Sequence, residues 1–233
     1  MRVLAIPGLA SGLTLFAAVT QASASIVDVT YTGTVELGFD SVGAFGGVGS
    51  LTGDTYKAVY VFNTSLGATF SSAHDNYATG GTEFGSTSPA LKASLTINGH
   101  TLSITPSYDG EIHGLNTTTG FGEQYHYAAQ NAPTYIYNSI INNTGTLPAS
   151  IAVPFSYTAV VGDSVNGGFV LDNSRVSGIL LPETLTYSLP TATPIPDTWT
   201  MMLTGLTGFG LMLCRRRTRH AFAGRPLRLA SAA

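Results

Sequence analysis

The sequence predicts an all-β protein whose body, residues 25–189, is an antiparallel β-sandwich or jelly roll. Short runs of two-residue hydrophobic alternation recur along the body, and glycine, asparagine and proline separate them. No apolar run with the 3.6-residue period of a helix reaches helix length between residues 25 and 190. Many short strands joined by turn residues are typical of sandwiches and jelly rolls.

The strands can be assigned in order along the chain. Val27, Val29 and Tyr31 alternate with polar residues, and residues 56–62 repeat the pattern. The clearest signal is at residues 91–104, where two alternating runs flank Asn98-Gly99, a pair that favours a two-residue type I′ turn. Further strands are predicted at residues 108–113, 121–129, 134–141, 151–161, 168–171, 175–181 and 183–189. The glycine-rich stretch within residues 32–53 is predicted as a loop with positive φ angles.

Charged residues are scarce and unevenly distributed. They make up 10% of the 233 residues, against about 25% in an ordinary globular domain, and the net charge is −3. Residues 25–197 hold three basic residues and all 13 acidic ones, a formal charge of −10. This composition excludes a solvated helical bundle, a coiled coil and a nucleic-acid binder that relies on a basic surface.

Residues 1–24 have the features of a secretory signal peptide, with a helical apolar core. Arg2 precedes an apolar run over residues 3–19. Ala22 and Ala24 then form an A-x-A cleavage pattern, so the mature chain is expected to begin at Ser25. The alternative is an uncleaved signal anchor.

The C-terminal region divides into a proline-rich linker at residues 190–197, an apolar segment at 198–214 and a basic tail at 215–233. The 17 apolar residues would span roughly 25 Å as a helix, the lower limit for a transmembrane segment. A buried core helix is the alternative. Trp199 suits the outer membrane interface, and a stop-transfer cluster follows on the cytoplasmic side. That cluster is Arg215, Arg216 and Arg217.

The same region resembles a known family of sorting signals. Pro194, Ile195, Pro196 and Asp197 precede Thr198-Trp199, a glycine-bearing apolar segment and the arginine cluster. This order resembles the PEP-CTERM signal, in which Pro-Glu-Pro, an aromatic residue, a short membrane helix and arginines follow one another. The resemblance implies export in a biofilm-forming Gram-negative bacterium and processing by an exosortase. Ile195 stands where the family has Glu, and 16 residues follow the arginines, where members of the family usually end.

The best constellation of chemical groups lies on two neighbouring predicted strands. Asp109, Glu111 and His113 share one face of the first strand. On the second, Glu123 shares a face with Tyr125 and Tyr127, while Gln124 and His126 take the opposite face. Carboxylates beside aromatic rings suit a sugar site, because the rings cover C–H faces and the carboxylates accept hydroxyl hydrogens. Asp109, Glu111 and Glu123 would be the carboxylates of a glycoside hydrolase. The alternative is an ordinary solvated strand face.

Other chemistry has weaker support. The body has no GxSxG motif and no cysteine, and His74-Asp75 is an adjacent pair in a predicted Gly/Ser-rich loop, so a nucleophilic hydrolase is not expected. The histidines lack zinc-site spacing, and no metal site is expected from them. A structural Ca²⁺ ion is the one cofactor left open. Its oxygen-rich loops would be those at Asp54, at Asp163 with Asn166 and at Asp172 with Asn173.

These observations together predict an exported, non-catalytic surface or extracellular-matrix protein. Its expected partners are the secretion machinery, the membrane through residues 198–214, an exosortase-type enzyme and polysaccharide, but not nucleic acid. The chain would pass through the inner membrane to the cell surface or the medium. The alternative is a carbohydrate-binding protein or glycoside hydrolase that acts on exopolysaccharide.

Overall fold

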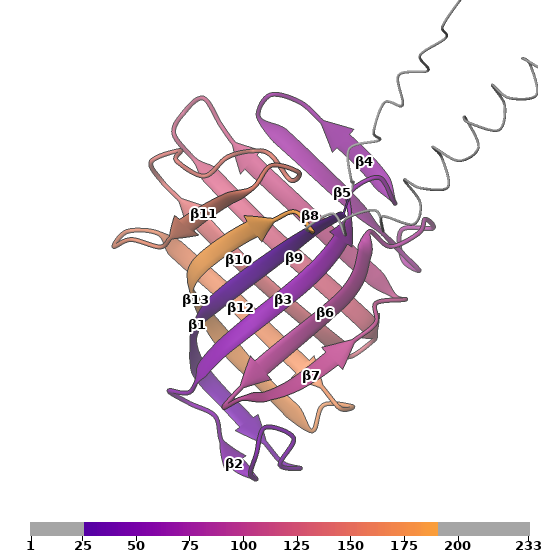
Figure 1. Cartoon of the computed structure of the whole chain (residues 1–233), viewed down its shortest axis with the longest axis vertical. Coiled ribbons are helices and arrows are strands. Elements are labelled where there is room, and N and C mark those ends of the chain that lie inside the picture. Colours follow the sequence, from indigo (N-terminus) through magenta and orange to yellow (C-terminus); the bar gives the residue numbers. More distant parts are fainter. Residues whose placement is uncertain (1–25, 191–233) are drawn as a thin grey trace, which may run out of the picture. The chain divides into compact units, whose positions relative to one another are not determined.

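The computed structural model describes residues 26–190, which form thirteen β-strands and no helix (Figure 1). The strands are β1 (Ile26–Asp40), β2 (Gly49–Ser50), β3 (Thr55–Asn63), β4 (Ala68–Ser71), β5 (Asp75–Gly81), β6 (Ala90–Ile97), β7 (His100–Ile104), β8 (Asp109–Asn116), β9 (Gly122–Asn131), β10 (Thr134–Asn142), β11 (Phe155–Thr158), β12 (Ser164–Leu171) and β13 (Val176–Ser188). This confirms the all-β prediction for the body. Among the described residues there is no helix able to cross a membrane. The predicted signal helix (1–24) and transmembrane helix (198–214) lie outside these residues.

All the strands belong to one antiparallel sheet. Its order is β4-β5-β8-β9-β10-β12-β13-β1-β3-β6-β7, with β11 paired to β13 and β2 to β1. The sheet curls, so that β1, β3 and β6 lie over β8, β9 and β10 (Figure 1). A sandwich would have two separate sheets, whereas here the two facing layers are joined through β12 and β13. We call the surface between the layers the inner face and the opposite surface the outer face.

Irregularities in the two longest strands accompany the curl. The register between β1 and β13 shifts at Thr32/Gly33 and again between Val35 and Leu37. Pro182, which has no N–H to donate, lies opposite Gly33 at the first shift. A Cβ atom at position 33 would lie 2.0 Å from the Leu181 carbonyl oxygen, so only glycine fits there. Such bulges bend a strand and increase its twist. The two strands predicted at residues 175–181 and 183–189 are therefore one continuous strand, β13.

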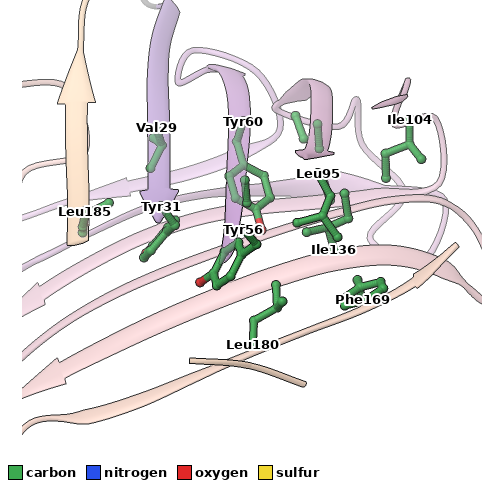
Figure 2. Close-up of a cluster of buried hydrophobic side chains, with 14 of the residues drawn as sticks. Val29, Tyr31, Tyr56, Tyr60, Leu95, Ile104, Ile136, Phe169, Leu180 and Leu185 are labelled. Carbon is green, nitrogen blue, oxygen red and sulfur yellow. The ribbon is translucent and has the colours of Figure 1, made fainter. Parts of the chain in front are cut away.

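The hydrophobic core fills the space between the two layers (Figure 2). Val29, Tyr31 and Tyr60 come from one layer, and Ile136 and Phe169 come from the other, all at most 1% exposed. Burying one large aliphatic side chain contributes about 1.5–3 kcal/mol. Because these side chains alternate along their strands, the inner face is mostly apolar while the outer face is free to carry polar and aromatic residues.

Hydrogen bonds between buried polar side chains also connect the two layers. The Tyr31 hydroxyl lies 2.7 Å from His126 Nδ1, and His126 Nε2 lies 2.5 Å from the Tyr187 hydroxyl. Tyr187 donates to Gln124 Oε1 at 2.6 Å, so His126 carries its proton on Nε2 and accepts from Tyr31 on Nδ1. His126 is fully buried, and this burial lowers its pKa well below the usual value. The imidazole is therefore neutral.

A second interlayer link is centred on Asn138, which is fully buried on β10. The Tyr56 hydroxyl donates to Asn138 Oδ1 at 2.8 Å. Asn138 Nδ2 donates to the Tyr60 hydroxyl at 2.7 Å. Both tyrosines belong to β3, so one amide satisfies two buried hydroxyls of the opposite layer.

Several local predictions can be compared with the structure. The hairpin at Asn98-Gly99 is confirmed: both residues have positive φ, 53° and 79°, between β6 and β7. The stretch after His74 was expected to be a loop, but it forms β5, which pairs with β8. Residues 151–161 contain only the short strand β11. Residues 32–40 extend β1, so the glycine-rich loop is shorter than expected.

Candidate functional site

Four tyrosines lie together on the outer face of the hairpin β9–β10. Tyr125 and Tyr127 alternate with buried residues on β9, and Tyr135 and Tyr137 do so on β10. The hairpin register places Tyr127 directly opposite Tyr137. Sequence analysis identified the first pair, and the turn between the strands adds the second. We call these four residues the tyrosine face.

The tyrosine rings contact one another diagonally across the two strands. Ring centroids are 6.4 Å apart for Tyr125 and Tyr137, and 6.2 Å apart for Tyr127 and Tyr135. Tyr135 and Tyr137, neighbours on β10, are also 6.2 Å apart. The rings in all three pairs are inclined by 37–38°, so they form a continuous and slightly staggered aromatic surface.

A glycine on the adjacent strand makes room for one of these rings. Gly168 of β12 is paired with Tyr137. A Cβ atom at position 168 would lie 2.7 Å from Cε1 of the Tyr137 ring. The Tyr137 ring therefore lies over the backbone of β12 and extends the tyrosine face beyond β10.

Two carboxylates border the tyrosine face. In the β8–β9 ladder Glu111 is opposite Tyr127, while Glu123 is on β9 itself, two residues before Tyr125. Burial raises the pKa of Glu111, the nearby His113 lowers it, and the charge of Glu123 raises it. Ser139 donates a 3.4 Å hydrogen bond to Glu123. Burial, followed by the charge of Asp109, raises the pKa of the Tyr127 phenol to about 12.

His113, between these groups on β8, pairs with a carboxylate on the next strand. Its Nε2 lies 2.9 Å from Oδ1 of Asp75 on β5. Its ring also contacts Tyr77 edge-on, with centroids 5.9 Å apart. Phe70 of β4 stacks on Tyr77 at 5.5 Å. Aromatic residues thus continue from the tyrosine face towards one edge of the sheet.

A hollow adjoins the tyrosine face on its other side. It has a volume of about 550 Å³. Its lining includes Tyr135, Val170, Ser177, Ile179, Leu37 and Phe39. Leu37 is 62% exposed and Phe39 is 54% exposed, so the hollow has apolar walls open to solvent. Because Tyr135 belongs to both, the hollow and the tyrosine face form one surface.

Asp109, the third predicted carboxylate, lies near Tyr127 but is buried and held by its own hydrogen bond. Its side chain is only 3% exposed. Asp109 Oδ1 accepts a hydrogen bond from the Glu83 backbone N–H at 3.2 Å. Asp109 therefore fixes the loop that follows β5, although it shares the outer face of β8 with Glu111 as predicted.

In two of the loops considered for calcium, the carboxylates of Asp54 and Asp163 accept hydrogen bonds from neighbouring side chains. Asp54 accepts a 2.7 Å hydrogen bond from Asn98. Asp163 accepts hydrogen bonds from Tyr157 at 2.7 Å and Asn142 at 2.9 Å. Asp172, with Asn173, borders a separate hollow at the β12–β13 turn. Within residues 26–190 no three His, Cys, Asp or Glu side chains come together in a group that could hold a metal ion.

The remaining predicted sites lie outside the described residues. These are the cleavage site at Ala22, Ala24 and Ser25, the sorting motif at Pro194, Ile195, Pro196, Asp197 and Trp199, and the cluster at Arg215, Arg216 and Arg217.

Sequence reasoning did not identify Tyr135, Tyr137 or the hollow. A Tyr-x-Tyr pair on each side of a short turn was the available signal for the two tyrosines, since a tight hairpin brings such pairs together on one face. No local signal exists for the hollow, because its walls come from β1, β10, β12 and β13.

In the comparison with known proteins, no family profile, curated protein or solved structure matches the chain.

Proposed function

We propose that this chain is an exported surface or extracellular-matrix protein whose β domain binds polysaccharide without catalysis. The single observation that supports this most is the tyrosine face bordered by Glu111 and Glu123 and continuous with an apolar hollow. Half-buried aromatic rings that adjoin an open apolar hollow are typical of interaction sites.

The chemistry of the surface suits a sugar chain. Sugar rings present C–H faces that pack on aromatic rings, and the phenol and carboxylate oxygens beside them can bond hydroxyl groups. From β8 to β1 the surface crosses five strand spacings of about 4.8 Å, roughly 24 Å in total. That length accommodates several sugar units of an extended chain rather than one monosaccharide.

The geometry favours binding over the alternative, glycoside hydrolysis. Retaining enzymes hold their two carboxyl groups about 5–5.5 Å apart, and inverting enzymes about 6.5–9.5 Å apart. Glu111 is opposite Tyr127, four residues along β9 from Glu123, so their backbones are roughly 14 Å apart. Their side chains would have to extend towards each other to reach either catalytic separation. Asp109 is occupied by the Glu83 N–H.

Export and sorting form the second part of the proposal and are supported by the sequence. Residues 1–24 would act as the signal peptide, and residues 198–214 would form the transmembrane helix, with Arg215 and its neighbours on the cytoplasmic side. The PEP-CTERM-like motif would direct processing by an exosortase. Intact-mass measurement of the secreted protein tests this: released chains should begin at Ser25 and lack Trp199 onward. Full-length protein found only in the inner membrane would contradict it.

Binding can be tested on a fragment comprising residues 25–190, because the described strands and their core lie within it. The fragment is applied to a polysaccharide array together with the double variant Tyr135→Ala/Tyr137→Ala. The wild type should bind at least one extended polysaccharide, and the variant should lose that binding at least tenfold. Phe84→Ala is the matched control, since Phe84 is 53% exposed and lies in the loop after β5. Equal binding by the double variant would overturn the assignment of the site.

A further inference from the structure

The charge of the tyrosine face distinguishes among polysaccharides. Glu111 and Glu123 border the face, and Asp75 lies beyond His113. Residues 26–190 contain three basic side chains, Lys57, Lys92 and Arg175. None of these lies on β5, β8, β9, β10 or β12, the strands that carry the face and its surroundings. His113 pairs with Asp75, and an anionic polymer would meet Glu111 and Glu123 with no Lys or Arg on the same strands.

Aromatic rings and carboxylates in this arrangement suit a cation. An ammonium group over the face of a tyrosine ring is attracted by the ring quadrupole. The register places Glu111 beside Tyr127, and Glu123 precedes Tyr125 by two residues on the same face. Burial and then the charge of Glu111 raise the pKa of the Tyr125 phenol, and the charge of Glu123 raises it further, so both carboxylates lie near the rings.

The spacing of Glu111 and Glu123 along the sheet suits a ligand with repeating units. They lie on neighbouring strands and are offset by four residues, roughly 14 Å along β9. A polymer with an amine on many of its rings could place separate ammonium groups at both positions while its ring faces cover the tyrosines between them.

We infer that the preferred ligand of the tyrosine face is a cationic amino-sugar polymer, one whose amino groups are free rather than N-acetylated. This inference rests on the proposed polysaccharide binding and names the class of polymer. Glu111 and Glu123 provide the charge preference, and the tyrosines provide the contact that any extended glycan would share.

The test compares two oligosaccharides that share a backbone and differ in N-acetylation, chitosan and chitin, with alginate as an anionic reference. Chitosan oligomers, chitin oligomers of the same length and alginate oligomers are titrated into the 25–190 fragment at about pH 6, where most amines and carboxylates are charged. We expect chitosan to bind roughly tenfold more tightly than chitin at low salt, since each exposed cation contact adds a few-fold. The preference should shrink at high salt, and alginate should bind most weakly.

Two variants test whether the preference for chitosan over chitin arises at the tyrosine face. Glu111→Gln/Glu123→Gln should reduce the chitosan-to-chitin ratio to about twofold while chitin binding persists. Asp28→Asn is the control, because Asp28 is on β1, outside the strands that carry the face. If Asp28→Asn lowers the chitosan-to-chitin ratio equally, the inference is overturned, because the preference then depends on the net charge of the fragment and not on the tyrosine face.

The outcomes separate the inference from the proposed function. Equal binding of chitin and chitosan, or a preference for alginate, would overturn the inference and leave polysaccharide binding intact. Absence of binding to every polymer on the array would overturn both.

Discussion

On the inner face of the sheet the tyrosine hydroxyls are buried and hydrogen-bonded, whereas on the outer face the tyrosine rings themselves form the surface. Tyr31, Tyr60 and Tyr187 are at most 3% exposed, and each hydroxyl has a partner in the opposite layer. On the outer face, Tyr137 has one long hydrogen bond, 3.4 Å to Asn166, and its ring packs on other rings. The same residue type thus links the two layers on one side and offers a contact surface on the other.

This difference follows from what each environment demands of a phenol. A buried hydroxyl without a partner costs about 1–3 kcal/mol, so every inner tyrosine requires a polar group opposite it. A half-exposed hydroxyl can bond water, so the outer tyrosines need only ring contacts. The inner set should therefore respond strongly to loss of a partner and the outer set weakly. The four predictions below test this expectation.

Replacing His126 should have the largest effect on stability. His126→Ala leaves the Tyr31 hydroxyl only its longer bond, 3.3 Å to the Gln124 carbonyl oxygen. It also removes the donor to Tyr187 and opens a cavity beside Phe62. We expect a loss of roughly 4 kcal/mol in the free energy of unfolding. Urea denaturation of the 25–190 fragment measures this. A loss below about 1 kcal/mol would show that the network contributes little to holding the layers together.

Acid should destabilise the fold through the same histidine. Because burial lowers its pKa in the folded state, His126 takes up a proton below about pH 6.5 only when the chain unfolds. The stability contributed by this group is complete above pH 6.5 and falls by roughly 1.4 kcal/mol per pH unit as the pH decreases towards the folded-state pKa. Urea titrations between pH 7 and pH 5 measure the slope. His126→Gln should flatten it, and an unchanged slope in that variant would assign the effect to other groups.

A matched pair of hydroxyl deletions compares the two faces directly. Tyr187→Phe leaves Gln124 Oε1 and the His126 N–H without their partner, and should cost about 2 kcal/mol. Tyr135→Phe removes a hydroxyl from the outer face and should change stability by less than about 0.5 kcal/mol. Thermal denaturation of both variants provides the comparison. Equal losses of stability in the two variants would contradict the different roles of the inner and outer tyrosines.

Gly168→Ala tests the outer face through binding, with only a small change expected in stability. Gly168→Ala should displace the Tyr137 ring at a cost below about 1 kcal/mol, since the new methyl group meets the edge of one side chain. Polysaccharide binding should nevertheless weaken several-fold, because the aromatic surface is no longer continuous. Gly47→Ala is the control, as a Cβ atom there meets nothing within 4 Å. Unchanged binding in Gly168→Ala would show that the exact position of this ring is unimportant.

The sequence was sufficient for the features that depend on local pattern. Alternation placed Glu111 and His113 on one face of β8, and it placed Tyr125 and Tyr127 on the face of β9 opposite to His126. Asn98-Gly99 predicted its hairpin because both residues tolerate positive φ. In each case the determining residues are within a few positions of one another.

The features that were not predicted depend on contacts between distant residues. The curl involves the register shift at which Gly33 meets Pro182, about 150 positions apart. The partners of His126 are Tyr31 on β1 and Tyr187 on β13, which are far from His126 and from each other along the sequence. β5 was missed because its glycines, Gly80 and Gly81, resemble a loop, although a Cβ atom at either position would clash with neighbouring backbone. Pairing and packing therefore override local propensity at these positions.

The adjacency of β1 and β13 has a mechanical consequence. Asp28 is opposite Ser188, so the chain enters and leaves the body at the same end of two neighbouring strands. A force that pulled these two ends apart would break the β1–β13 ladder one hydrogen bond at a time. A force applied between the end of β13 and a polymer held on the outer face would instead pull along the strand and load many ladder bonds at once. The domain should therefore resist tension between a tethered C-terminal end and a bound matrix far better than tension between its own two ends.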